Sequence, residues 1–238
     1  MNIGIQVPLA QELSTLTTLK VAPGSCVSIA NNITVCLSGI GKQNTRKAFA
    51  ELMNHKIDLI ISWGSAAGLS SELNAGDLLI PELITVSNEV YTSDRIFCEH
   101  LLSMIPKGLS VHRGPITETN KVLRTKEDKQ ALFQTGKFIA ADMESGTLAR
   151  LAADNSLPFA VIRAVSDPVN VTLPKTLIDS FNRPSFNPTG FVVRSLLRPS
   201  EWSQLIKLNK SFKKAKKSLN FVGQILIAQS DQWMYPPL

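Results

Sequence analysis

The chain has 238 residues, of which 44% are apolar, and its 25 Lys and Arg against 19 Asp and Glu leave a formal net charge of +6. The length allows one large domain or two small ones, and the composition excludes general disorder, collagen-like repeats and low-complexity classes. No apolar run approaches the roughly 18 residues of a membrane-spanning helix, and the start shows neither a cationic leader nor a cleavage site, so we expect a soluble cytoplasmic protein.

Short β-branched runs alternate with longer helical patterns along most of the chain. Continuous apolar runs are typical of strands covered on both faces, and they predict strands at residues 3–7, 33–38, 58–63, 77–86 and 159–166. Helical spacing predicts helices at residues 45–55, 93–105, 125–134 and 142–155. Residues 27–30 and 33–37 predict an antiparallel hairpin. Together these elements predict a single-domain α/β fold, a three-layer sandwich with a central mixed, largely parallel sheet.

The last quarter of the chain differs in composition. Residues 172–199 are rich in Pro and Asn, which predicts loops. From Glu201 to Val222, apolar residues recur at steps of three and four, and six lysines take other positions of the helix (207, 210, 213, 214, 216 and 217). This pattern predicts a basic amphipathic helix appended to the domain. We therefore divide the chain into a main part, residues 1–190, and a C-terminal helical extension of the same domain, residues 191–238.

Two roles remain open for the helix from Glu201 to Val222. It is either a docking helix whose lysines face water, or a surface helix that binds anionic lipid and places the protein peripherally on the inner membrane face. Binding to nucleic acid is not supported, because the sequence holds no recognition motif.

The chain offers little for metal or redox chemistry. Cys26, Cys36 and Cys98 are odd in number and lack C-x-x-C spacing, which predicts reduced thiols rather than disulfides or a zinc site. None of the three histidines stands at metal-ligand spacing from another. A G-x-G-x-x-G fingerprint for a dinucleotide is also missing. We therefore expect neither a metal nor another cofactor.

Three acidic residues, Glu12, Glu144 and Asp167, follow predicted strands or open predicted helices, where open α/β sheets bind their ligands. Each also has a purely structural interpretation. The helix dipole favours acids in a first turn, which accounts for Glu12 and Glu144. Asp167 precedes Pro168, a common arrangement of an N-cap and a first helical residue. Taken one at a time, the structural interpretations are the stronger ones.

Two glycine-rich turns accompany the acids. Gly64-Ser65-Ala66-Ala67-Gly68 directly follows a predicted strand, and its small residues let backbone amides approach a ligand. Ser38-Gly39-Ile40-Gly41-Lys42 follows another strand and opens a helix. The second turn lacks the spacing of a nucleoside-triphosphate loop.

Taken together and in this order, the motifs are far more specific. The first strand with Glu12, then Ser-Gly-Ile-Gly-Lys, Gly-Ser-Ala-Ala-Gly, Asp-Met-Glu-Ser and Arg-Ala-Val-Ser-Asp resemble the nucleoside phosphorylase/nucleosidase superfamily. The likeness to its methylthioadenosine/S-adenosylhomocysteine nucleosidase branch covers about residues 1–170. The segment from Gly190 to Pro199 and the basic helix resemble the hopanoid-associated phosphorylase branch, a less specific likeness.

The resemblance implies cofactor-free cleavage of the N-glycosidic bond of a purine nucleoside through an oxocarbenium-like transition state. It makes Asp167 the general acid that protonates N7 of the base, Glu12 the base that activates water, and Glu144 the acceptor of hydrogen bonds from the ribose hydroxyls. Two carboxyl groups, one protonated and one not, follow the logic of glycoside hydrolysis. Arg163 is expected to orient Asp167 from the same strand.

The resemblance also implies how the substrate is held. The expected binding residues are Met143, Ser65, Ala66, Gly68, Val122, Leu123, Ile40 and Ser166, with Ser166 also orienting Asp167. A small-molecule nucleoside with a large 5′ group, specifically adenosylhopane, is the expected substrate. Family members usually form dimers or larger oligomers in which a neighbour closes the 5′ pocket, so we expect a homo-oligomer.

Two departures from the family pattern bear on the reaction. Phosphorolytic relatives carry arginines for phosphate, but residues 7–11 contain none and Ser62 stands at the second position, which favours hydrolysis. Val122 stands where nucleosidases place an aromatic residue on adenine, so base preference is open. The alternatives are phosphorolysis of purine nucleosides, hydrolysis of methylthioadenosine or S-adenosylhomocysteine, and a non-catalytic nucleoside-binding protein.

Overall fold

A computed structural model describes residues 1–181 and 198–233. Its centre is a block of parallel strands made by β1 (Ile3–Val7), β3 (Ile33–Leu37), β4 (Leu59–Gly68) and β11 (Phe159–Asp167). Strand β4 pairs with β1 on one side and with β11 on the other. The expected hairpin is confirmed, because β2 (Cys26–Ala30) runs antiparallel to β3. These strands carry the long apolar runs of the sequence.

The sheet branches at the C-terminal half of β4. One branch continues through β10 (Ala140–Asp142), β9 (Ile116–Glu118), β6 (Leu83–Val86) and β7 (Glu89–Thr92). The other leads from β11 to β5 (Leu78–Leu79) and β8 (Val111–His112). The strand predicted at residues 77–86 is therefore wrong as one element. Pro81 interrupts it, because proline has no N–H for a ladder, and the two pieces join different branches.

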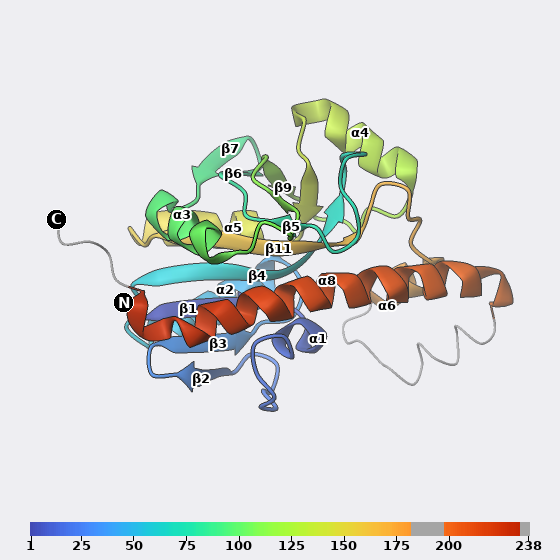
Figure 1. Cartoon of the computed structure of the whole chain (residues 1–238). Coiled ribbons are helices and arrows are strands. Elements are labelled where there is room, and N and C mark those ends of the chain that lie inside the picture. The colour runs from blue at the N-terminus through green and yellow to red at the C-terminus, as the bar shows by residue number, and fades with distance from the viewer. Residues whose placement is uncertain (182–197, 234–238) are drawn as a thin grey trace.

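Helices cover both faces of the sheet, which confirms the three-layer α/β sandwich (Figure 1). Alternate residues of the central strands supply the two cores: Ile61 and Ile162 face one side, Ile60 and Val161 the other. The helices are α1 (Ala10–Leu13), α2 (Lys42–Met53), α3 (Arg95–Met104), α4 (Lys126–Gly136), α5 (Ser145–Asp154), α6 (Lys175–Phe181) and α8 (Trp202–Ala228). The short 3-10 turns are η1 (Pro199–Glu201) and η2 (Ser230–Gln232).

Helix α8 is part of the core rather than an appendage, which corrects the prediction from the sequence. It lies along β11, with Ala215, Leu219, Val222 and Leu226 buried in the same cluster as the central strands. In Figure 1 it crosses the sheet, while its N-terminal end reaches past the sheet beside α6. In the described ranges, no helix is both long and apolar enough to span a membrane.

Three further predictions need correction. The helix expected from residue 142 begins at Ser145, because Asp142 still belongs to β10. The loop predicted at residues 172–199 contains α6, while residues 182–197 lie outside the described part. No helix starts at Pro168, so Asp167 is not an N-cap and its structural interpretation is wrong. These differences free Asp142 and Asp167 for other contacts.

Candidate active site

Three carboxyl groups reach the same short stretch of β4. Glu12 lies on α1, directly after β1, and bonds to Ser65. Asp167 ends β11 opposite Ala67, after an irregularity in the register. Glu144 follows β10, which runs antiparallel to the end of β4. Parallel strands present their carboxyl ends at one edge, so residues far apart in sequence meet there.

Glu12 is almost fully buried and well supplied with donors. Its Oε1 accepts hydrogen bonds from the Ser65 backbone N–H (2.8 Å) and hydroxyl (2.6 Å), and its Oε2 accepts one from the Leu9 N–H (3.1 Å). Burial raises the pKa of the Glu12 carboxyl, while Arg163 and these three donors oppose the rise. The donors hold the carboxylate in place and stabilise its ionised form, which is the form that a base for water needs.

Arg163 is fully buried and lies among three carboxyl groups. Its Nε is 2.8 Å from Asp142 Oδ2 and its Nη2 is 3.8 Å from Glu144 Oε2. A side chain on Gly64 would collide with the Arg163 guanidinium and the Glu12 carboxyl. Gly64 is therefore needed for the close approach of this cation to β4. The expectation that Arg163 orients Asp167 is wrong. The guanidinium forms ion pairs with Asp142 and Glu144 and acts electrostatically on Glu12 instead.

One guanidinium cannot neutralise three carboxylates. Of the ion pairs that Arg163 forms with Asp142 and Glu144, the one with Asp142 is the shorter, and Asp142 also accepts hydrogen bonds from the Ser145 backbone and hydroxyl. Burial raises the pKa of Glu144 to about 8, Arg163 opposes that rise, and the charge of Asp142 adds to it. Burial and the neighbouring charge of Asp142 therefore favour the protonated form of Glu144.

The turn before α2 holds Glu144 from the other side. The Gly41 N–H donates to Glu144 Oε1 at 2.8 Å, and Gly41 has a φ of +89°, which only glycine adopts readily. The next residue, Lys42, lies 3.2 Å from the buried carboxyl of Glu118, which also accepts hydrogen bonds from Thr147. The Ser-Gly-Ile-Gly-Lys turn therefore contributes a backbone N–H that binds the carboxyl group of Glu144.

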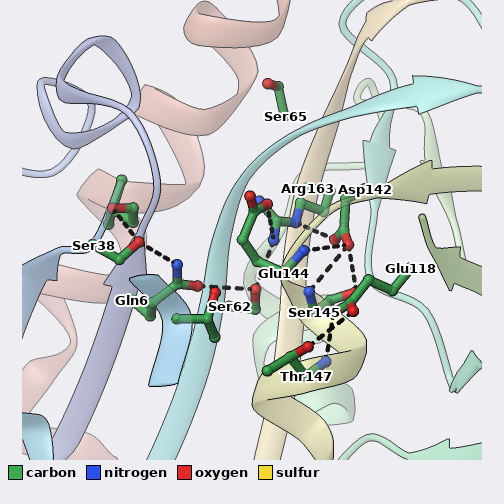
Figure 2. A network of polar contacts seen from close by, with 12 residues as sticks. Gln6, Ser38, Ser62, Ser65, Glu118, Asp142, Glu144, Ser145, Thr147 and Arg163 are labelled. Carbon is green, nitrogen blue, oxygen red and sulfur yellow. Dashed lines mark hydrogen bonds and ion pairs between the residues drawn. The ribbon is translucent and has the colours of Figure 1, made fainter. Parts of the chain in front are cut away.

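A buried polar chain crosses the central strands beneath the acids (Figure 2). Arg163 donates to the Ser62 hydroxyl (2.7 Å), Ser62 to Gln6 Oε1 (3.5 Å), and Gln6 to the Ser38 hydroxyl (2.5 Å). Gln6, Ser62 and Arg163 are all fully buried. The Ser62 hydroxyl is thus already bonded to Arg163.

Asp167 sits apart from this network and has its own two partners. The Ser166 hydroxyl donates to its Oδ1 at 2.6 Å, as expected, and the Nζ of Lys129 lies 2.8 Å from its Oδ2. Lys129 is fully buried on α4 and also donates to the backbone carbonyls of Asp167, Pro168 and Val171. Burial raises the pKa of Asp167, and Lys129 and Ser166 oppose the rise.

The expected binding residues border this stretch of β4. Ala66, Gly68 and Ser166 are buried beside Asp167, with the Ser166 hydroxyl 3.3 Å from the Ala66 carbonyl. The remaining ones are half-buried: Ser65 lies on β4 itself, and the others lie on turns, namely Ile40, Met143, Val122 and Leu123. The turn holding the last two is tied to the loop after Asp167, because Leu173 N–H donates to the Arg124 carbonyl.

The sequence did not single out Lys129, Asp142 or Gln6 as functional. Lys129 stands in Lys-Glu-Asp-Lys at a helix start, a pattern typical of an exposed face. Asp142 precedes Met143 and Glu144 in the strongest motif, and its place there was the one available signal. Gln6 was a visible clue of another kind, because it is the one long polar residue in an apolar first strand.

Comparisons with known proteins bear on the family and the fold of the chain. The model of the phosphorylase superfamily matches residues 24–184. A 5′-methylthioadenosine/S-adenosylhomocysteine nucleosidase of Haemophilus influenzae is 27% identical over 198 residues, covering 70% of this chain and 86% of that protein.

Solved structures show the same fold. The 5′-methylthioadenosine/S-adenosylhomocysteine nucleosidase of Neisseria meningitidis, in complex with methylthio-immucillin-A, aligns with a TM-score of 0.70 at 21% identity, covering 95% of this chain and 99% of that one. Futalosine hydrolase of Helicobacter pylori strain 26695 aligns with a TM-score of 0.67 at 17% identity, covering 97% of each. The fold and family expectations are thus confirmed. Because the family model spans more than half of its length, this chain belongs to the phosphorylase superfamily.

Proposed function

We propose that the protein cleaves the N-glycosidic bond of a 5′-substituted adenine nucleoside. The observation that carries the proposal is the separation of carboxyl environments around one stretch of β4: Glu12 held by three donors, and Asp167 buried beside Lys129. Groups whose environments differ in this way suit a base and an acid in one reaction. The relatives named as nucleosidases support the same reaction class.

In the proposed reaction, Asp167 gives its proton to N7 of the base as the C1′–N9 bond breaks and its electron pair moves onto adenine. Water attacks C1′, and Glu12 takes the proton that the water loses. Adenine leaves neutral, Asp167 is left as a carboxylate and Glu12 as a carboxylic acid, so a proton returns through solvent before the next turnover. Glu144 and Met143 bind the ribose. The roles expected for Asp167, Glu12, Glu144 and Met143 are thus part of this proposal.

Hydrolysis is the expected mode, and product analysis tests it. With 5′-methylthioadenosine in phosphate buffer, we expect adenine and the free 5-methylthioribose. The physical reason is that residues 7–11 hold no arginine and Ser62 is already bonded to Arg163, so a phosphate dianion lacks a bidentate partner. A ribose 1-phosphate as the main product, with a rate that rises with phosphate, would overturn hydrolysis. Absence of adenine release from every 5′-substituted adenosine tested would overturn the cleavage itself and favour a binding protein.

Adenosylhopane is the specific substrate that we propose. The support for this substrate is the resemblance of the C-terminal region to the hopanoid-associated branch. Residues 190–197 of that region lie outside the part of the chain that the structure describes. A series of adenosines with 5′-methylthio, 5′-alkyl and 5′-hopanyl groups measures the preference. We expect kcat/KM to rise with the size of the apolar 5′ group. We also propose a homodimer, and light scattering on the same preparation measures the molecular mass that tests it.

We also propose that the N-terminal half of α8 contacts anionic membrane lipid. Buried side chains of this helix begin only at Ala215, where it meets the sheet. Before that point, Trp202 is 47% and Ile206 57% exposed, one helical turn apart. Four exposed lysines follow on the same half, namely Lys207, Lys210, Lys213 and Lys214. Exposed apolar anchors beside cations are the two terms that surface binding needs. Docking on the domain explains the second half of the helix, as the alternative prediction stated.

Sedimentation with vesicles tests this contact. We expect the protein to pellet with phosphatidylglycerol vesicles at low salt and to be released at high salt, because each lysine near an anionic surface contributes about 1 kcal/mol that salt screens. Replacing Trp202 and Ile206 by Ser should weaken binding, while Leu19→Ser, a matched change at a residue 52% exposed elsewhere, should not. If the protein stays in the supernatant at low salt, the membrane contact is wrong and the nucleosidase proposal is unaffected.

A further inference from the structure

The most unusual side chain outside the expected site is a buried lysine. Lys129 is completely inaccessible to solvent, although it is the fourth residue of α4 and its neighbours Lys126, Glu127 and Asp128 are exposed. Burying an ammonium group is costly unless it is paired and hydrogen-bonded. Lys129 meets that requirement with four oxygen atoms at 2.8 to 3.0 Å, of which only one, Oδ2 of Asp167, belongs to a charged group.

The four oxygens all belong to the segment that begins with Asp167. Besides the carboxyl, the ammonium binds the carbonyls of Asp167, Pro168 and Val171. Lys129 therefore fixes both the side chain of Asp167 and the backbone that carries it. The capping box at Thr125 starts the helix, and the Arg124 carbonyl accepts from Leu173, so α4 and this loop are joined at two places.

We propose that Lys129 is the counter-ion of the general acid: its ammonium balances the negative charge that appears on Asp167 when this carboxyl protonates the departing base. The proposal rests on the proposed nucleoside cleavage. Lys129 acts through Asp167 and is a positioning residue. Its role differs from that of Arg163, which acts on Glu144 and Glu12, the carboxyl groups proposed to bind ribose and to activate water.

Among the partners of the Asp167 carboxyl in the described residues, Lys129 is the charged one. From α4 comes Lys129, from β11 itself comes the neutral Ser166 hydroxyl, and opposite on β4 lies Ala67. Burial favours the protonated carboxyl, whereas the adjacent ammonium favours the carboxylate. The net pKa of Asp167 is raised, and the ammonium limits that rise. Without the ammonium, proton donation would leave an unpaired buried carboxylate.

The test compares Lys129→Gln with Lys129→Arg in adenine release from 5′-methylthioadenosine across pH. Glutamine removes the charge but still donates to carbonyls, and arginine keeps the charge. For the glutamine variant we expect kcat to fall about 10- to 100-fold, with little change in KM. Since Asp167 must be protonated to act and loses the cation that lowers its pKa, the alkaline limb of the pH profile should move to higher pH. The arginine variant should keep the limb near its original place. Lys126→Gln, an exposed change on the same helix, is the matched control.

Two further measurements separate this role from a merely structural one. In an Asp167→Asn background, Lys129→Gln should cost no additional activity, because the charge it balances no longer forms. Second, 13C NMR of labelled aspartate carboxyls, with the Asp167 signal identified by its loss in Asp167→Asn, should show a higher pKa for Asp167 in Lys129→Gln. This readout needs no activity, so it decides the Lys129 proposal even if no nucleoside is cleaved. An unchanged pKa and an unmoved alkaline limb, or an equal loss of activity in both backgrounds, would overturn the proposal.

Discussion

Replacing Asp167 by Asn is expected to lower kcat for adenine release by about 10²–10⁴. The amide keeps the size of the carboxyl but has no proton to give to N7 of the base. The folded structure also responds, because Lys129 loses the one charged partner that it has in the described part of the chain. We therefore expect a lower melting temperature as well, and a folded but slow enzyme at moderate temperature. Steady-state kinetics with 5′-methylthioadenosine measures the first effect, and circular dichroism checks the fold.

The matched control for Asp167→Asn is Asp77→Asn. The Asp77 side chain accepts a hydrogen bond from the Asn74 backbone N–H and lies 3.2 Å from His112 Nε2, and neither partner is one of the three carboxyl groups of the site. Its replacement tests whether loss of any partly buried aspartate slows the enzyme. If Asp167→Asn releases adenine at a near-normal rate, Asp167 is not the general acid.

Replacing Glu12 by Gln is expected to cost a similar factor, about 10²–10⁴ in kcat, because an amide cannot take a proton from water. The Gln oxygen can still accept from Ser65, but its NH2 group would then face the Leu9 N–H that now donates to Oε2. Two donors would meet, so some stability is lost too. Measurements of kcat and of the acidic limb of the pH profile, which the protonation of Glu12 should set, check this prediction.

Glu144→Gln serves as the comparison for Glu12→Gln. Since burial favours the protonated form of Glu144, an amide resembles that form. We expect a rise in KM from weaker ribose binding and a smaller fall in kcat than for Glu12→Gln. Equal losses in kcat for the two variants would contradict the assignment of Glu12 as the base.

Local sequence patterns predicted the elements that carry strong periodicity. The strand of residues 3–7 and the hairpin around Asn31 and Asn32 are found as expected, because their apolar runs and turn residues act within a few positions. The split of residues 77–86 was missed because the two pieces are both apolar. Only the branching of the sheet at β4 sends them to different neighbours.

The α8 helix shows the same limit. Its amphipathic spacing is legible in the sequence, but the spacing does not say which part of the apolar face is covered. The domain covers it from Ala215 onward, whereas Trp202 and Ile206 remain exposed. Coverage depends on how far the sheet extends along the helix, which is a property of the assembled layers.

By itself, the sequence determined the fold class, the superfamily and the candidate acids Glu12, Glu144 and Asp167, because short motifs at strand ends are local. Only the tertiary structure decided which charge each acid meets. Arg163, four residues before Asp167 on the same strand, pairs with Asp142 instead, and Asp167 is paired with Lys129, 38 residues earlier on a helix. The two-residue period of a strand would place Arg163 and Asp167 on the same face, but the register of β11 is irregular between Val165 and Asp167. A helix, in turn, packs where the sheet order places it. Contacts between such distant residues therefore follow from the order of the strands and leave no local pattern in the sequence.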